Sequence, residues 1–195
     1  MPLGFPAIVP SSSRWTIISN QRQFISPLSG AIQTAQRTGN RWRATLEFAN
    51  LTGADRAVMQ AFLSQLQATA NNFYLEDHSY TRRADGTGTP RVNGASQTGN
   101  QLVTDGWSGT YAMLRGDLFE VNGELKMAVS DATISAGSAT IDFVPELREA
   151  PANDALITIS NPKGIFRLTA PESSWSNQPG VFSTFSIEAI EDVIA

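Results

Sequence analysis

The sequence predicts a mainly β protein: a β-sandwich or barrel with one packed α-helix, and a smaller inserted domain that resembles a β-barrel. Three observations lead to this fold class. Apolar and polar residues alternate over 41–48, apolar residues recur at helical spacing over about 52–68, and short alternating runs return over 98–160. The 195 residues are enough for one domain, or for two small ones that share a core.

The first 13 residues are expected to form an extended arm, because three of the first ten are proline. A frayed terminus is one interpretation of such a segment. The alternative is an arm that docks on a neighbouring subunit, since its apolar side chains would gain nothing in a free tail. The candidate contact residues in this arm are Leu3, Phe5 and Ile8.

Strands and turns alternate over the next 35 residues. We expect a short strand at 15–18, a turn at 26–30, an extended run at 31–37 and a hairpin-type turn at 38–40. The clearest strand is 41–48. Its even-numbered apolar residues predict one buried face and its odd-numbered polar residues one wet face.

One helix is expected, from about 52 to 68. Thr52 and Asp55 fit a capping box, in which each side chain binds a free amide of the first turn. The apolar residues that share one face are Val58, Met59, Phe62, Leu63 and Leu66. This face should lie across the sheet.

The segment 76–100 shows no periodicity and holds four glycines, so we interpret it as an exposed loop, with 81–97 as the connection between two domains. Arg82 and Arg83, with Arg91, form a candidate patch for an anion or a partner. A solvated loop is the plainer explanation of these charges.

The segment 98–160 is expected to fold as an inserted β domain. Strands are indicated at 118–121, 125–129, 139–144 and 156–159, and Asn122-Gly123 is a strong tight-turn signal. Further strands at 164–168 and 181–194 should return to the first sheet. The first domain would then comprise 1–80 together with 161–195.

Composition restricts the classes of function. Charged residues make up 16% of the chain, the net charge is −4 and the isoelectric point is about 5.0. This balance argues against stable nucleic-acid binding and against adhesion to anionic lipid. No apolar run is long enough for a transmembrane helix, and the first ten residues lack the pattern of a secretory signal, so we expect no membrane insertion.

No catalytic, cofactor or metal motif is apparent. Cysteine is absent and His78 is the single histidine, which excludes cysteine sites and histidine-based metal sites. Asp77 is adjacent to His78 and points to the opposite side of an extended chain, so it cannot orient the ring as in a catalytic triad. Trp107 and Trp175 lie in stretches rich in Gly, Ser and Asn, where contact with another subunit or a ligand is an alternative to packing.

Several short segments, spread over most of the chain, carry a further signal. They are 24–30, 31–34, 39–42, 51–52, 73–75, 95–99, 114–119, 139–148, 163–168 and 185–189. In this order they resemble the tail proteins of long, flexible-tailed bacteriophages, particularly the distal tail proteins at the end of the tail tube. None of these segments is a catalytic motif.

The resemblance implies a structural virion protein rather than an enzyme. Such a protein is made in the cytoplasm of the host bacterium and forms a ring, commonly a hexamer, at the phage tail tip. The ring connects the tail tube protein to tail-tip hub or receptor-binding proteins, and the inserted β domain would face outward. The alternatives are a tail tube protein, a carbohydrate- or receptor-binding module of the tail and, from the acidic residues, a glycan hydrolase.

Overall fold

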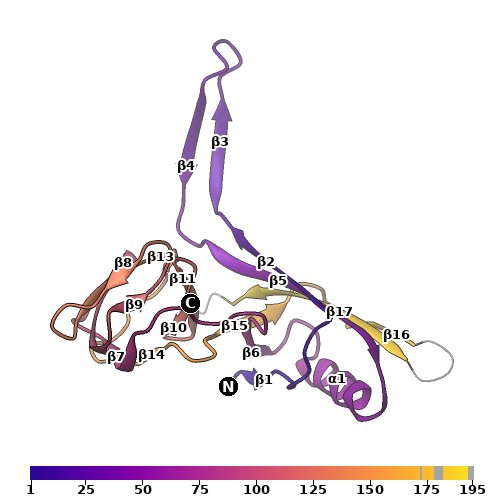
Figure 1. The fold of residues 1–195 in the computed structure, drawn as a ribbon. Coiled ribbons are helices and arrows are strands. Elements are labelled where there is room, and N and C mark those ends of the chain that lie inside the picture. The colour runs from indigo at the N-terminus through magenta and orange to yellow at the C-terminus, as the bar shows by residue number, and fades with distance from the viewer. Residues whose placement is uncertain (172, 178–181, 193–195) are drawn as a thin grey trace.

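The computed structural model describes residues 1–171, 173–177 and 182–192. Strands dominate this part of the chain and one α-helix accompanies them, so the predicted fold class is confirmed. Figure 1 shows a twisted sheet with the helix beside it, a barrel-like sheet next to it, and a hairpin that rises above both.

The first sheet takes strands from both ends of the chain, in the order β1-β6-β15-β17-β5-β2, with β16 paired to β17. The bounds are β1 Leu3–Gly4, β2 Ser12–Ile18, β5 Arg41–Leu51, β6 Asn72–Glu76, β15 Lys163–Leu168, β16 Trp175–Asn177 and β17 Ser183–Glu191. Ile187 of β17 lies opposite Leu46 of β5, which confirms that the last strand returns to the first sheet. Positions 181, 193 and 194 of that predicted strand lie outside the described residues.

The helix α1 (Gly53–Leu66) packs against the core of this sheet. Its buried residues are Met59, Phe62, Leu63 and Leu66. Val58 is 49% exposed at the rim of this stripe, so the expectation that it shares the buried face is wrong. The predicted capping box is also wrong, because the side chain of Thr52 makes no capping hydrogen bond.

The second sheet curls into a nearly closed barrel with the order β14-β10-β11-β13-β8-β7. The bounds are β7 Thr87–Val92, β8 Gly99–Ser108, β10 Leu118–Val121, β11 Glu124–Ala128, β13 Ala139–Leu147 and β14 Ile157–Thr158. A small sheet of β9 (Tyr111–Met113) and β12 (Ala132–Thr133) completes it. The division of the chain into domains stays a prediction, but these strands enclose a separate group of buried apolar residues.

The segment 81–97 is not only a connecting loop, because β7 lies within it and pairs with β8. Glycines in a sequence usually indicate a loop, but here Gly88 allows β7 to pair closely with β8. A Cβ atom on Gly88 would lie 2.3 Å from the carbonyl oxygen of Gly106, and one on Gly106 would lie 2.5 Å from that of Thr89. Both glycines also have positive φ angles, so the close approach of β7 and β8 requires residues without a side chain.

Buried polar groups join the barrel to the first sheet. Glu191 of β17 accepts hydrogen bonds from the backbone N–H groups of Trp42, at 3.1 Å, and Leu125, at 3.0 Å. Arg148, just after β13, forms an ion pair with the same carboxylate. Burial raises the pKa of Glu191, and the Arg148 guanidinium opposes that rise. The negative charge of Glu191 on the first sheet and the positive charge of Arg148 on the barrel therefore neutralise each other.

Lys126 of β11 is a second buried charge near this junction. Its ammonium nitrogen lies 2.5 Å from Glu124 Oε2 and donates to the backbone oxygen of Glu146 at 2.8 Å. Burial lowers the pKa of Lys126, and the neighbouring Glu124 carboxylate opposes this effect. An unpaired ion at this depth would cost several kcal/mol, roughly, so the pair must stay together.

Candidate interaction surfaces

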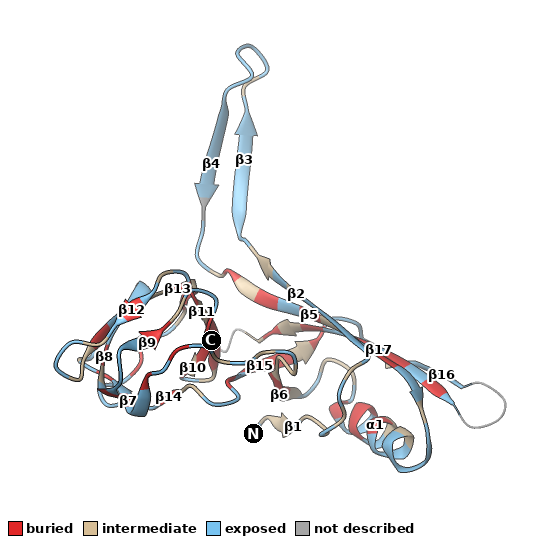
Figure 2. Cartoon of the chain, in the orientation of Figure 1, coloured by how far each residue is buried: buried red, intermediate tan, exposed pale blue. Residues whose placement is uncertain are grey.

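The hairpin of β3 (Gln21–Ile25) and β4 (Ile32–Gln36) is the most exposed part of the described chain. Its antiparallel register pairs Gln21 with Gln36 and Ile25 with Ile32. Every residue of β3 is exposed, and so is each residue of β4 whose burial is described. Figure 2 shows the hairpin pale blue along its length, standing away from the two packed sheets.

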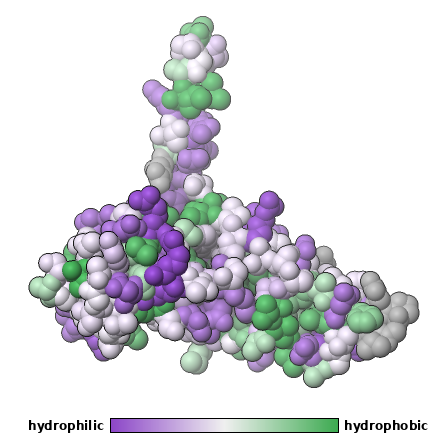
Figure 3. All heavy atoms as spheres, viewed as in Figure 1, coloured by the Kyte–Doolittle hydropathy of each residue, from purple (hydrophilic) through white to green (hydrophobic). Residues whose placement is uncertain are grey.

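Large apolar side chains lie on this hairpin without a core to cover them. The exposed fractions are 57% for Phe24, 64% for Ile25, 99% for Leu28 and 63% for Ile32. Figure 3 shows these hydrophobic groups as green patches on the column. A two-stranded hairpin alone is marginally stable in water, and clustered exposed apolar groups mark interaction sites. The hairpin is therefore a candidate docking arm.

The base of the hairpin is fixed by a carboxylate from the barrel. Glu146 of β13 accepts hydrogen bonds from the backbone N–H of Gly39, at 2.9 Å, and from Asn40 Nδ2, at 2.8 Å. Asn40 Oδ1 in turn accepts from the backbone N–H of Asn20 at 2.8 Å. Burial alone would raise the pKa of Glu146, but hydrogen bonds from its own backbone N–H, Gly39 and Asn40 lower it. This chain of contacts orients the hairpin relative to the barrel.

Charge is distributed unevenly between the hairpin end and the remainder of the protein. The first 46 residues hold five arginines and no acidic residue, so all 18 carboxylates lie in the later 149 residues. Arg22 and Arg37 belong to the hairpin and its base. Electrostatic complementarity therefore favours an acidic surface as the partner of the hairpin, and the later part of a second copy carries such a charge excess.

The predicted arm packs on its own chain. Leu3 lies in β1, which pairs in parallel with β6, and Phe5 contacts Phe62 and Phe73 with ring centroids 5.1 and 5.8 Å apart. Ile8 also packs on the first core. These three residues are partly buried within the protomer, so the segment is not a frayed terminus, and its contact with a neighbouring subunit stays a prediction.

The two candidate tryptophans have different environments. Trp107 lies in β8 rather than in a loop, is 4% exposed, and donates from Nε1 to Thr104 Oγ1 at 2.8 Å. It belongs to the barrel core and offers no contact surface. Trp175 lies in the short strand β16, is 37% exposed and packs 6.3 Å from Phe185, so one side of it is open.

The candidate arginines do not form one patch, because different groups hold each of them. Arg82 donates from Nη2 to the backbone oxygen of Ala112 at 2.8 Å. Arg83 is exposed and its Nε lies 3.9 Å from Asp117 Oδ1. Arg91 donates to the backbone oxygen of Asp154 at 2.9 Å. Arg82 alone of these three lines a cleft that lies beside the barrel.

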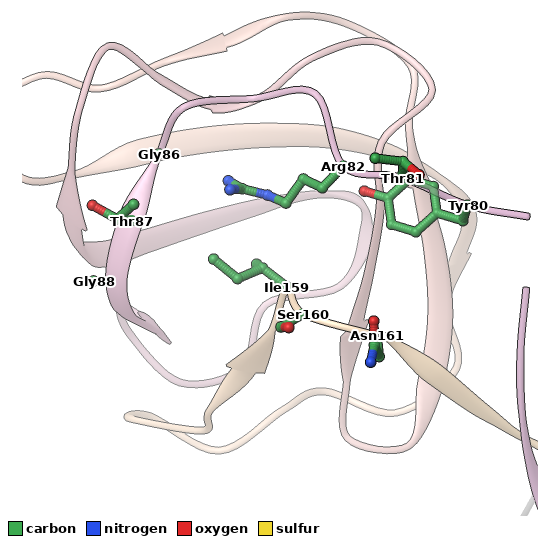
Figure 4. A pocket seen from close by; sticks show the side chains of 9 residues that line it. All are labelled: Tyr80, Thr81, Arg82, Gly86, Thr87, Gly88, Ile159, Ser160 and Asn161. Atoms are coloured by element: carbon green, nitrogen blue, oxygen red, sulfur yellow. The ribbon is translucent and has the colours of Figure 1, made fainter. Parts of the chain in front are cut away.

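That cleft has a volume of about 580 Å³ and opens on the barrel surface. Its lining comes from two chain segments, Tyr80, Thr81, Arg82, Gly86, Thr87 and Gly88 from the first, and Ile159, Ser160 and Asn161 from the second. Figure 4 shows the Arg82 side chain extending between the two segments.

Comparison with protein-family models and with curated proteins finds no match to this chain. Within the described part of the chain, no three His, Asp or Glu side chains gather as a metal site would require. None of its helices is long and apolar enough to cross a membrane. The interaction surfaces therefore have to be interpreted from their own chemistry.

The sequence interpretation missed the hairpin as a functional element. It recognised the turn at 26–30 and the extended run after it, but not that these stand alone. One signal was present: Phe24 and Ile25 are adjacent and so point to opposite faces of the ribbon. When a two-stranded hairpin has apolar side chains on both faces near its tip, a core that packs on one face leaves the other face exposed.

Proposed function

We propose that this protein is a structural subunit of a phage tail, which assembles as a homo-oligomeric ring at the distal end of the tail tube. The observation that carries the proposal is the exposed hairpin with Phe24, Ile25, Leu28 and Ile32. These side chains require a partner surface, and a repeated assembly supplies the same surface to every copy. In the virion, the ring would connect the tail tube protein to tail-tip hub or receptor-binding proteins.

The placement of the hairpin favours a head-to-tail contact. It rises where β2 ends and β5 begins, whereas β16, with Trp175, lies toward the opposite end of the first sheet (Figure 1). Phe182, just before β17, is 45% exposed and adds apolar surface near that end. A contact between two different surfaces of identical subunits closes into a ring when the rotation permits it. Such a ring would place the hairpin of one subunit on the next.

The test measures the mass of three purified proteins by light scattering and images each by negative stain. They are the wild type, a triple variant of the hairpin and a double variant of the barrel as the control. The triple variant replaces Ile25, Leu28 and Ile32 with Ser. The control replaces Val103 and Val129, which are 40% and 43% exposed on the barrel, with Ser. We expect closed rings for the wild type and the control, and monomers for the hairpin variant.

Other outcomes would change the proposal. Long tubes of stacked rings would favour the tail tube protein over the ring at its end. Rings that persist in the hairpin variant would contradict the docking role of the hairpin. Monomers of the wild type at high concentration, with and without added tail tube protein, would contradict the ring itself.

A further inference from the structure

The barrel seam between β7 and β14 is closed at one end only. Arg91 bridges to Leu156, and the backbone N–H of Val92 donates to the oxygen of Ala155 at 2.9 Å. If this antiparallel pairing continued, Thr87 would lie opposite Ser160. These two residues instead line the cleft on either side (Figure 4). The cleft therefore lies where this pairing stops, between the edge of β7 and residues 159–161, which follow β14.

Arg82 brings a positive charge into this opening. Its guanidinium extends toward the segment that carries Gly86, Thr87 and Gly88 (Figure 4). Nη2 donates to the oxygen of Ala112, while Nε is buried without a hydrogen-bond partner in the described structure. A guanidinium has five N–H donors, and a buried donor left unpaired is costly. Nε itself is enclosed by protein, so an anion in the cleft would bind the remaining N–H groups of the guanidinium.

Apart from Ile159 and the two glycines, the remainder of the lining is polar, and it carries no carboxylate. Thr81, Thr87 and Ser160 supply hydroxyl groups, and Asn161 supplies an amide. Hydroxyl and amide groups both donate and accept, as sugar hydroxyls do. Gly86 and Gly88 contribute backbone to this lining, since a side chain on either would point toward the backbone of Tyr111 or Gly106.

Tyr80 limits what kind of ligand this lining favours. Its hydroxyl donates to the backbone oxygen of Leu118 at 3.3 Å, and burial raises its pKa to about 12, so it stays neutral. The phenol is thus tied to the barrel wall rather than free to stack on a nucleobase. Ile159 is the one aliphatic residue of the lining, so an extended peptide would find few apolar pockets.

We propose that this open seam binds an acidic saccharide. Arg82 binds the carboxylate or phosphate group of the sugar, and Thr87, Ser160 and Asn161 bind its hydroxyl groups. A volume of about 580 Å³ lies in the range of small-ligand sites and exceeds the needs of a lone inorganic anion. The inference does not depend on the assembly proposed above, because the hairpin contributes nothing to this lining.

The experiment titrates the full-length protein with four small probes, glucuronic acid, glucose 6-phosphate, glucose and inorganic phosphate, and with a short glutamate-rich peptide. Binding is followed by calorimetry and by chemical shifts of backbone amides. We expect the two acidic sugars to bind with dissociation constants of about 1 mM, typical of a few polar contacts. Glucose and inorganic phosphate should each bind about tenfold more weakly than the acidic sugars.

Matched variants locate the site. Arg82→Gln should weaken binding of the acidic sugars by about tenfold or more, since it removes charge-assisted hydrogen bonds. Arg115→Gln removes the same charge from an exposed position of the barrel and should leave binding unchanged. Ser160→Ala, which keeps Arg82 and its bond to Ala112, should weaken binding by a few-fold, about what one neutral hydrogen bond contributes.

Three results would overturn the proposal. Acidic sugars that bind no better than glucose would remove the role of charge, and inorganic phosphate that binds equally well would show an anion site without sugar recognition. Binding of the peptide in place of the sugars would assign the seam to an extended chain. If Arg82→Gln fails to fold, the Ser160→Ala titration and the shifted amides decide the matter.

Discussion

Two hairpins of this protein have nearly the same local construction and opposite surroundings. β10–β11 and β3–β4 are both antiparallel pairs of short strands, joined by two residues in the first and by six in the second. In β10–β11, Phe119, Val121 and Leu125 are fully buried, and so is the charged Lys126. In β3–β4, Phe24 and Ile25 are more than half exposed. Strand pairing therefore does not decide where a hairpin gains its stability.

The comparison shows what each hairpin depends on. Burial of a large apolar side chain contributes roughly 1.5–3 kcal/mol, and the barrel provides this to β10–β11 within one protomer. The same chemistry on β3–β4 gains nothing until another surface covers it. The buried hairpin should thus respond strongly to substitution in the isolated chain, and the exposed one only in an assembly.

The largest effect is expected for Phe119→Ala in β10. Phe119 has no exposed surface and packs edge-on against Phe143, with ring centroids 5.5 Å apart. Its truncation leaves a cavity in the barrel, so the free energy of unfolding should fall by about 4 kcal/mol. Urea denaturation of the two proteins measures the difference. A loss below about 1 kcal/mol would mean that the barrel core does not hold this hairpin.

A slightly smaller effect is expected where the buried hairpin meets the first sheet. Glu191→Ala leaves the Arg148 charge and the N–H groups of Trp42 and Leu125 unpaired, and should cost about 3 kcal/mol. The control is Glu188→Ala, which breaks a half-exposed ion pair with Arg43 and should cost less than about 1 kcal/mol. Equal losses in the two variants would contradict the role given to burial.

A third effect concerns the base of the exposed hairpin and depends on pH. The pKa of Glu146 is lower in the folded protein than its ordinary value of 4.5, so folding favours the charged form. Its contribution is present above that value and is lost as the pH falls through the folded pKa. Glu146→Gln should therefore cost about 1–2 kcal/mol near neutral pH and progressively less in acid below pH about 4.

Urea denaturation of both proteins across this pH range measures the loss, and Glu149→Gln serves as the control. Glu149 is exposed, so its variant should show no such convergence. A difference between wild type and Glu146→Gln that stays constant from neutral to acidic pH would show that protonation of Glu146 does not loosen the base of the hairpin.

Much of the fold was predictable because its signals are local. The alternation in β5, the apolar stripe of α1 and the regular strand β17 each follow from the spacing of a few neighbouring residues. β7 was not predictable in this way, because Gly88 is needed for close approach to β8, a partner that the local pattern does not reveal. Packing and contact stayed open for Trp107 for the same reason, since its neighbour Gly106 belongs to strand pairing.

The interaction surfaces were harder to predict than the strands. Leu3 and Phe5 were correctly singled out as apolar residues in need of a partner, but the partner is the core of their own chain. Contact of Arg82 with an anion stays a prediction, and the cleft around it could not be foreseen because residues 159–161 are far away in sequence. The hairpin is exposed because no other element of the described chain packs on it, and a short sequence segment does not indicate how distant elements pack.

The smallest effect on the isolated protomer is expected for Phe24→Ser in the exposed hairpin. Phe24 lies opposite Gln33 and is 57% exposed, so its loss should change the free energy of unfolding by no more than about 0.5 kcal/mol. The same substitution should weaken self-association by about tenfold or more, because a large aromatic group would then be missing from the contact. Urea denaturation and the concentration dependence of the mass by light scattering measure the two quantities. A stability loss similar to that of Phe119→Ala would instead place Phe24 against its own protomer, and the contrast between the two hairpins would disappear.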